Sequence, residues 1–392
     1  MNGFERIYAV MSGGSTDRTP FMPKIWVRLA CEITGISLVD ILADPFLAMA
    51  CTVRAGLMCD ADGARVFRFP KRQTVRDEDG GLLEVSGGVQ IGRIDTKGGL
   101  STYLYEDGTM DIGDEYEMTF VQFKKQKSPL VKSITDARRI AVPGKALFKD
   151  LGFDSYYKKM LAESNGIAIA GDCGSATLSF HSHFRGSAQS LMDFYDEPGL
   201  VSAVMDKGVE TAVAHGKFCI DSGLRILRLN DSTANMNVIS PDIFRDFIKP
   251  RFREICDELH SYNKDVRIYC HNCGNILPIM NDLVETGLDC IAPLDPLGGF
   301  NCTDARAAVP EGYPLMGGMD TLSFINRTQD EITAEANACI AGAGRNGAFI
   351  LGTGCVLPPG SDPGLIKAAA AAAHSHRIEY SRDRRIERGK SL

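Results

Sequence analysis

The hydrophobic pattern of the chain changes near residue 150. Before it, an apolar helical stretch from Trp26 to Cys59 gives way to short segments in which apolar and polar residues alternate. Alternation with a period of two is typical of strands, and the glycine-rich turns between these segments are typical of antiparallel hairpins. Residues 1–150 are therefore expected to form helices and a β-hairpin elaboration. The alternating segments are Arg65–Phe69, Gly88–Arg93 and Ser101–Tyr105, and the turns are Asp79–Gly81, Lys97–Gly99 and Asp107–Gly108.

After residue 150, short apolar strands alternate with helical stretches such as Pro241–Ser261, for which Ser240 is a suitable cap, and Thr328–Ala343. Repeated strand–helix units predict an α/β fold, a parallel (β/α)8 TIM barrel whose main part is residues 151–392 and whose missing strands come from the N-terminal half. A doubly wound open sheet is the alternative, but no G-x-G-x-x-G follows a first strand. The expected strands are Gly166–Ala170, Leu224–Leu229, Val266–Cys270, Asp289–Pro293, Pro314–Gly317 and Ala348–Leu351.

Composition narrows the class of protein. With 44% hydrophobic and 24% charged residues, the chain can build a folded core. A net charge of −7 and the lack of a basic run with interleaved aromatics argue against nucleic acid as a partner. No apolar run is long enough to span a membrane, and the start, Met1–Arg6, lacks the apolar stretch of a signal peptide. Twelve cysteines without such a signal fit a reducing compartment, so we expect a cytoplasmic protein.

Three potential metal ligands follow two of the expected strands. His271 and Cys273 come at the end of one strand, and Cys355 comes after the last one. Residues two apart share one face of a strand, so His271 and Cys273 can reach one ion while Cys270 points the other way. One imidazole and two thiolates leave one position of a tetrahedral zinc open for a substrate. The spacing favours a catalytic zinc site and thiolate or methyl-transfer chemistry.

Two other interpretations of these cysteines stay open. Cys270 and Cys273 form a C-x-x-C, which is the spacing of a redox pair. Such pairs usually open a helix with the first cysteine exposed, whereas Cys270 closes an apolar strand. Cysteine also behaves as a small hydrophobic residue, so these thiols could be buried and inert. The spacing by itself does not decide between the three.

Polar residues gather where the expected strands end, which is where the active sites of such barrels lie. Asp231 is a candidate general acid or a residue that orients the substrate. Asp295 is a candidate fourth, displaceable zinc ligand, or an acceptor that orients His271. For each aspartate the alternative is a loop or helix-cap role. The full set is Asp172, Cys173, Asn230, Asp231, Ser232, His271, Cys273, Asp295, Asp320 and Cys355.

A family resemblance is carried by motifs between about residues 150 and 375. They are Asp231–Thr233, Ile239–Phe244, Phe247–Pro250, His271–Asn275, Glu285–Asp289 and Gly317–Asp320, with Arg18-Thr19-Pro20 near the start. Together these segments resemble the uroporphyrinogen decarboxylase superfamily. The resemblance implies a (β/α)8 barrel, in agreement with the strand–helix pattern.

The histidine and two cysteines point to one branch of that superfamily. The zinc-dependent methyltransferases of this fold, which include methylcobamide:coenzyme M methyltransferases and O-demethylase components, carry a His-x-Cys with a late Cys. The resemblance thus implies zinc at His271, Cys273 and Cys355, with Asp295 where related methionine synthases have an acidic ligand. It also implies methyl transfer between a small methyl ether or thiol and the cobalt of a corrinoid. Because the chain has no Asp-x-His-x-x-Gly, we expect the corrinoid on a separate partner protein.

Two other functions are kept as alternatives. A decarboxylase acting on a tetrapyrrole needs several cations for the porphyrin carboxylates, and of the N-terminal residues Arg18 and Arg28 alone are too few. A catalytically silent barrel that only binds a small molecule or a corrinoid partner would not need a metal with an open position. The identity of the methyl donor and acceptor does not follow from the sequence, because the fold does not fix the substrate.

Overall fold

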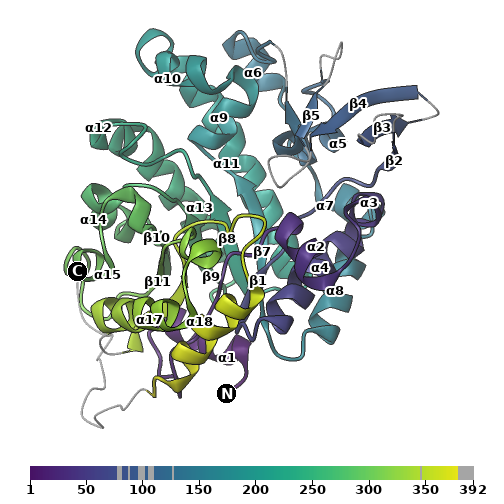
Figure 1. The fold of residues 1–392 in the computed structure, drawn as a ribbon. Coiled ribbons are helices and arrows are strands. Elements are labelled where there is room, and N and C mark those ends of the chain that lie inside the picture. Colours follow the sequence, from purple (N-terminus) through teal and green to yellow (C-terminus); the bar gives the residue numbers. More distant parts are fainter. Residues whose placement is uncertain are drawn as a thin grey trace.

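The computed structural model describes residues 1–76, 82–86, 89–95, 102–104, 110–125, 128–344 and 347–377. At its centre lies a parallel sheet that curves into a barrel, with helices around it (Figure 1). The six strands expected after residue 150 are all present, and a seventh comes from the N-terminal half. In spatial order the strands are β1 (Gly63–Arg65), β7 (Ala168–Ser175), β8 (Ile226–Asn230), β9 (Arg267–His271), β10 (Cys290–Leu294), β11 (Leu315–Met319) and β12 (Phe349–Thr353).

An extended segment, Pro20–Met22, occupies the eighth position between β12 and β1. The amide of Leu351 donates to the carbonyl of Pro20 at 2.9 Å, and the amide of Met22 donates to the carbonyl of Leu351 at 2.8 Å. On the other side, the amide of Asp62 donates to the carbonyl of Phe21 at 2.7 Å. The predicted TIM-barrel-like α/β fold is therefore confirmed, with an irregular segment in place of one strand.

The helices that follow the strands cover the outside of the barrel (Figure 1). Ser240 caps its helix as expected by accepting a hydrogen bond from the amide of Ile243, and a π-helical turn at Phe244–Ile248 interrupts that helix. No helix among the described residues is long and apolar enough to cross a membrane. The helices are α8 (Phe153–Glu163), α9 (Leu178–Arg185), α10 (Ser187–Asp196), α11 (Pro198–Asp221), α12 (Pro241–Ile243), α13 (Lys249–Tyr262), α14 (Met280–Val284), α15 (Cys302–Ala307), α16 (Ser323–Asn326), α17 (Gln329–Ala343) and α18 (Pro363–Ser375).

Alternate residues of each strand feed two separate cores. Inward residues such as Tyr269 and Met316 fill the barrel, and outward residues such as Cys270 pack under the helices. Helix α1 (Gly3–Met11) covers the amino-terminal end of the barrel and adds Ile7 and Val10 to the inner core. Side chains thus fill the amino-terminal part of the barrel interior, and the carboxyl-terminal end is left for a functional site.

The N-terminal region has the expected helices and antiparallel strands. A five-stranded sheet stands beside the barrel, in the order β2-β3-β4-β5-β6 (Figure 1). One expectation is wrong: Arg65–Phe69 is not part of a hairpin, because Arg65 ends the parallel barrel strand β1. The turns expected at residues 79–81, 97–99 and 107–108 lie outside the described residues. The elements are α2 (Val27–Thr34), α3 (Leu38–Ala43), α4 (Pro45–Met58), β2 (Gln73–Arg76), β3 (Leu82–Ser86), β4 (Val89–Asp95), β5 (Thr102–Leu104), α5 (Glu115–Thr119), β6 (Lys124–Lys125), α6 (Ile134–Arg139) and α7 (Lys145–Asp150).

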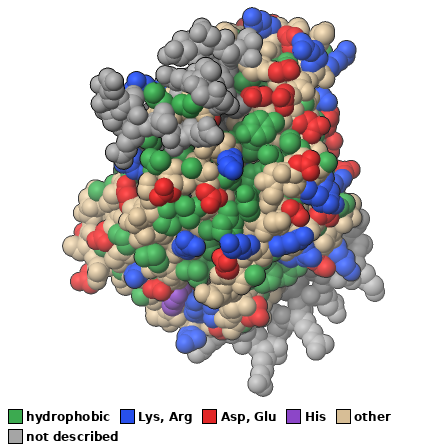
Figure 2. All heavy atoms as spheres, turned by 90° about the vertical axis from the view of Figure 1, so that its right-hand side faces the viewer, with side chains coloured by type: hydrophobic (Ala, Val, Ile, Leu, Met, Phe, Trp, Pro, Cys, Tyr) green, Lys and Arg blue, Asp and Glu red, His purple; other side chains and the backbone are tan. Residues whose placement is uncertain are grey.

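The face on the right of Figure 1, where α2, α3, α4 and α8 lie, is drawn in Figure 2. Hydrophobic side chains gather near its centre, with charged side chains around them (Figure 2). Helix α4 contributes buried residues such as Met49 and Val53 to the main core, and Met58 at its end is exposed. The N-terminal helices are therefore packed onto the barrel by the same core that lies under the other helices.

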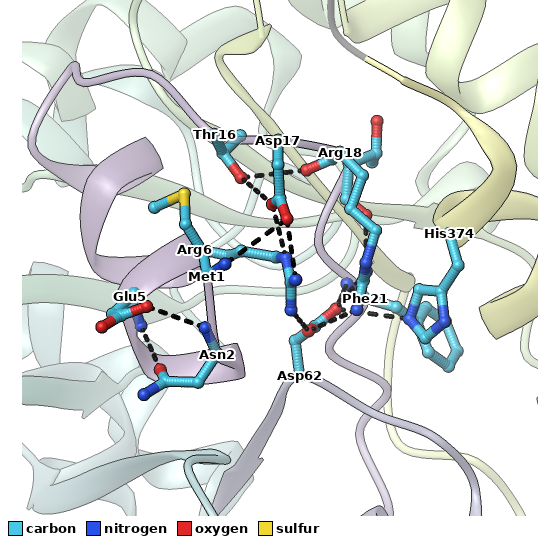
Figure 3. A network of polar contacts seen from close by, with 11 residues as sticks. Met1, Asn2, Glu5, Arg6, Thr16, Asp17, Arg18, Phe21, Asp62 and His374 are labelled. Atoms are coloured by element: carbon cyan, nitrogen blue, oxygen red, sulfur yellow. Dashed lines mark hydrogen bonds and ion pairs between the residues drawn. The ribbon is translucent and has the colours of Figure 1, made fainter.

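A network of charges joins the first and last elements of the barrel at its amino-terminal end (Figure 3). Asp62, which precedes β1, accepts hydrogen bonds from Arg6 on α1 at 3.1 Å and from Arg18 at 2.8 and 2.9 Å. It also accepts one from the amide of Phe21 at 2.9 Å, and His374 on α18 lies 3.5 Å away. Arg18 is therefore a structural residue at the end of the barrel opposite to the strand-end aspartates.

Candidate metal centre

Strand β9 places His271 inside the barrel at its carboxyl end. Tyr269 points into the barrel and Cys270 points out under the helices, so His271 points in again. Its side chain is buried, and Cys273 follows two residues later. The two cysteines of the C-x-x-C thus lie on different sides of the sheet, and burial raises the pKa of Cys270. The arrangement does not favour a redox pair.

Cys355 completes a cluster of three metal-binding donors. It lies just past the end of β12, which is separated from β9 by two strands of the sheet, β10 and β11. The donor atoms of His271, Cys273 and Cys355 all lie within 4.8 Å of one another, and Nε2 of His271 is 3.9 Å from Sγ of Cys355. One imidazole and two thiols converging from separate strands match the ligands of zinc. The three residues could hold a single ion, as their spacing predicts.

Asp295 shapes the turn that carries Cys273. One oxygen of its carboxylate accepts a hydrogen bond from the amide of Gly274 at 2.9 Å, and the other accepts one from the amide of Leu297 at 3.1 Å. Gly274 has φ of 87°, a conformation that favours glycine. Asp295 is close enough for its charge to raise the pKa values of both thiols, but it is not a member of the three-donor cluster. Its role as a metal ligand stays a prediction.

The pKa values of Cys273 and Cys355 depend on each other. A hydrogen bond from the Cys273 thiol lowers the pKa of Cys355 to about 6, helped by the charge of Lys24 and opposed by burial. The same hydrogen bond, together with burial, raises the pKa of Cys273. Burial and three nearby cations lower the pKa of His271 well below its usual value, so its imidazole is neutral. A thiolate and a neutral imidazole are the forms that bind a metal.

Two buried cations lie next to this cluster, and the sequence pattern did not single them out. Lys24 follows the segment Pro20–Met22, and Arg65 ends β1. The Arg65 guanidinium packs over the rings of Trp26 and Phe67, and its Nη1 lies 3.5 Å from Nδ1 of His271. Burial lowers the pKa of Lys24 to about 7. The sequence does mark Arg65 as a charged residue within an apolar run. The direction in which its side chain points, however, depends on the pairing of β1.

Asp231 lies deep under the loop between β7 and α9. Its carboxylate accepts hydrogen bonds from the amides of Thr177 and Ser179, at 3.0 and 2.9 Å, and from both of their hydroxyls. Burial raises its pKa. These contacts give Asp231 a part in holding the loop, and a catalytic role stays a prediction.

Other polar residues at the strand ends also have structural contacts. Asp172 on β7 accepts a hydrogen bond from Arg228 on β8 at 2.7 Å, and Asn230 accepts another from the same guanidinium. The side chain of Asp320 accepts from the amide of Leu322 and so caps a turn. Cys173 is buried in the core under the helices. Of the ten residues predicted at the strand ends, three form the metal-binding cluster.

Comparison with known proteins shows which family the chain resembles. Its residues 120–376 match the family of uroporphyrinogen decarboxylase (URO-D). Over 174 residues it is 24% identical to the methylcobamide:CoM methyltransferase MtaA of Methanosarcina barkeri, covering 44% of this chain and 48% of that protein. It is 29% identical over 213 residues to a uroporphyrinogen decarboxylase of Saccharophagus degradans, covering 51% and 57%. The matches therefore span about half the length of these curated relatives.

A solved structure shares the fold over almost the whole chain. It is a methyltransferase from Methanosarcina mazei, which superposes with a TM-score of 0.70 at 16% identity and covers 96% of this chain and 99% of that one. Such a likeness establishes the barrel and leaves the chemistry to the site. The family match covers well over half of the chain and includes β7 to β12, which carry the three donors. The chain belongs to the uroporphyrinogen decarboxylase family.

Proposed function

We propose that the protein is a zinc-dependent methyltransferase. It moves a methyl group between a small substrate, a methyl ether or a thiol, and the cobalt of a corrinoid that a partner protein carries. The observation that carries the proposal is the convergence of His271, Cys273 and Cys355 at the carboxyl ends of β9 and β12. The relatives named methylcobamide:CoM methyltransferase support it.

Each residue of the centre has a part in this chemistry. His271, Cys273 and Cys355 would hold the metal, which would supply Lewis acidity to the sulfur or oxygen that loses or receives the methyl group. As a ligand, Cys273 would have to be deprotonated, as Cys355 already tends to be. Asp295 keeps the turn at Gly274 in place and so fixes the position of Cys273. Burial, together with the cations nearby, lowers the pKa of His271 and keeps its imidazole neutral.

Three exposed large hydrophobic residues follow the ends of barrel strands and support docking of a partner there. They are Val238 after β8, Leu297 after β10 and Ile325, in helix α16 (Ser323–Asn326), after β11. Apolar side chains exposed around one opening are typical of a protein-binding site. We propose that the corrinoid protein docks on these loops and so brings its cobalt to the metal centre.

The alternative function is decarboxylation of a tetrapyrrole, and the uroporphyrinogen decarboxylases among the relatives support it. Lys24 and Arg65 at the mouth could bind carboxylates, which is the observation in its favour. Decarboxylation, however, gives no use to two thiols and an imidazole that converge within 4.8 Å. We therefore rank methyl transfer first.

Metal analysis tests the proposal. We expect about one zinc per chain in the wild-type protein purified without chelators, and loss of zinc in His271→Ala, Cys273→Ser and Cys355→Ser. Cys270→Ala is the matched control, because Cys270 belongs to the same C-x-x-C but points under the helices. It should keep its zinc. A folded wild-type protein without zinc would contradict the proposal and favour the decarboxylase.

Methyl transfer gives the second readout. With methylcobalamin and a thiol acceptor, the wild-type protein should demethylate the corrinoid, and Cys355→Ser should lose this activity while its circular dichroism is unchanged. For the docking surface, Leu297→Glu should raise KM for the corrinoid protein and leave the reaction with free methylcobalamin unchanged. Met58→Glu on α4, which is similarly exposed, is its control. Unchanged activity in Cys355→Ser would mean that the barrel acts without this metal centre.

A further inference from the structure

Two thiols outside the metal centre meet between the N-terminal helices. Cys31 lies on α2 and Cys51 on α4, two helices that pack side by side (Figure 1). The two thiols form a hydrogen bond with each other, and the hydroxyl of Thr34 lies 3.3 Å from Sγ of Cys51. Both cysteines are free, and the proposed methyl transfer uses neither. Two free thiols in contact can be joined as a disulfide when they are oxidised.

The surroundings of this pair favour a thiolate, which is the reactive form of cysteine. The hydrogen bond from Cys31 lowers the pKa of Cys51, helped by Thr34 and by the charge of Arg54 and opposed by burial. The charge of Arg28 also acts on the Cys31 thiol, which keeps 9% of its surface exposed. A stabilised thiolate with a second thiol against it is typical of redox-sensitive cysteines.

A second pair of thiols in the same protein provides an internal comparison. Cys302 on α15 and Cys339 on α17 also form a hydrogen bond, and both sulfurs would touch a Cβ placed on Gly318 of β11. The hydrogen bond with Cys302, burial and the charge of Glu335 all raise the pKa of Cys339. Cys339 is therefore kept as a neutral thiol. Contact between sulfurs occurs in both pairs, and the stabilised thiolate at Cys51 distinguishes the first.

Helix α2 connects the pair on α2 and α4 with the metal centre. Glu32, the residue after Cys31, accepts a hydrogen bond at 2.8 Å from the amide of Gly360, which lies in the loop that carries Cys355. Trp26 is the residue at which α2 begins. An S–S bond of about 2.05 Å is shorter than a hydrogen bond between sulfurs, so a disulfide draws α2 towards α4. Both the loop and Trp26 should then move with the helix.

We propose that Cys31 and Cys51 are a redox-sensitive pair that hydrogen peroxide converts to a disulfide, and that this disulfide shifts the loop that carries Cys355. In the first step a thiolate of the pair attacks one oxygen of the peroxide. An S–O bond forms, the O–O bond breaks, and hydroxide leaves and takes up a proton as water.

In the second step the other sulfur loses its proton and attacks the oxidised sulfur. The S–S bond forms, the S–O bond breaks, and the leaving hydroxide takes the proton as a second water. The two sulfurs are thus oxidised by two electrons and one peroxide is reduced to two waters. The disulfide does not depend on the proposed function, whereas its effect on methyl transfer rests on it.

Disulfide mapping tests the modification. The zinc-loaded protein is treated with hydrogen peroxide, free thiols are alkylated, and linked peptides are identified by mass spectrometry. We expect the Cys31–Cys51 link to form at least about tenfold faster than a Cys302–Cys339 link, and dithiothreitol to reverse it. Cys31→Ser should abolish the link, and Cys302→Ser, the matched control, should keep it. Cys31 and Cys51 that stay free, or that are linked no faster than Cys302 and Cys339, would overturn the proposal.

Fluorescence tests the link between the pair and the metal centre, because Trp26 is the only tryptophan of the chain. Peroxide should change Trp26 fluorescence and lower the rate of methyl transfer at least about threefold in the wild-type protein, since effective transfer depends on exact positioning. Dithiothreitol should restore both, and Cys31→Ser should show neither change. A disulfide that leaves fluorescence and rate unchanged would overturn the proposed shift.

Two variants separate this inference from the proposed function. Glu32→Ala, which removes the contact with Gly360, should still form the disulfide but lose most of its effect on the rate. Cys355→Ser, which has no complete metal centre, should still form the disulfide and change its Trp26 fluorescence. Disulfide formation in a protein that transfers no methyl group would leave the redox-sensitive pair standing and overturn the proposed function. An active protein in which Cys31 and Cys51 resist peroxide would do the reverse.

Discussion

Buried charges are paired at one end of the barrel and lack hydrogen-bond partners at the other. At the amino-terminal end, the carboxylate of Asp62 forms ion pairs with Arg6 and Arg18, and His374 lies 3.5 Å from it (Figure 3). At the carboxyl-terminal end, Lys24 and Arg65 are buried with donor groups that bond to nothing in the described part of the chain. The first arrangement stabilises the fold, and the second leaves binding capacity for a ligand. The difference separates stability from function within one barrel.

Asp62→Ala is expected to have the largest effect on this comparison. The change takes the carboxylate partner from the mostly buried Arg18, leaves Arg6 with Asp17 alone and removes the acceptor of the Phe21 amide. We expect the free energy of unfolding, measured with urea, to fall by about 4 kcal/mol. Asp17→Ala is the control, because Asp17 pairs with the same Arg6 but is about one-third exposed. A loss no larger than in this control would mean that the network does not hold the barrel ends together.

The pH dependence of stability gives the next largest effect. Burial acts to raise the pKa of Asp62, but hydrogen bonds from His374 and Arg18 lower it from its ordinary 3.8 to about 2. A folded-state pKa below the unfolded one adds stability above the unfolded value, and this stability is lost as the pH falls from about 4 towards 2. The stability difference between the wild-type protein and Asp62→Asn should shrink by about 2 kcal/mol over that range. Parallel curves for the two proteins would count against the assignment.

At the mouth, removal of a charge should have the opposite sign. Lys24→Met keeps the length of a buried side chain and removes an ammonium group that has no hydrogen-bond partner. We expect the free energy of unfolding to rise by about 1 kcal/mol in the protein without ligand. Lys24→Arg, which keeps the charge, should show no gain. A clear loss of stability in Lys24→Met would mean that the lysine is paired in solution and that the two ends of the barrel are alike.

The same comparison shows what the sequence could predict. Strands and their ends follow from local apolar runs, so the positions of His271, Cys273 and Cys355 relative to the barrel were predictable from alternation and from the place of active sites in such folds. Charge pairing was not, because its partners lie far apart in the chain: Arg18 and Asp62 are 44 residues apart, and Arg65 and His271 are 206. Only the folded barrel brings them together.

Arg65 illustrates the limit most clearly. Its segment, Arg65–Phe69, alternates apolar and charged residues as a hairpin strand does, and the pattern predicted an antiparallel hairpin. In the structure, β1 pairs in parallel with β7 and forms no hairpin, and this pairing places Arg65 beside the metal-binding cluster. Asp231 shows the same dependence, since its hydrogen-bond donors, Thr177 and Ser179, come from the preceding strand–helix unit. Tertiary context overrides local pattern at both positions.

The smallest expected effect concerns the other N-terminal cation. Arg28 is 39% exposed and lies 3.4 Å from Glu32, one turn further along α2. An exposed pair of this kind is screened by water, so Arg28→Ala should change the free energy of unfolding by less than about 0.5 kcal/mol. A loss above about 1 kcal/mol in Arg28→Ala would mean that an exposed pair stabilises the protein as the buried network at Asp62 does, and would remove the contrast between buried and exposed ion pairs.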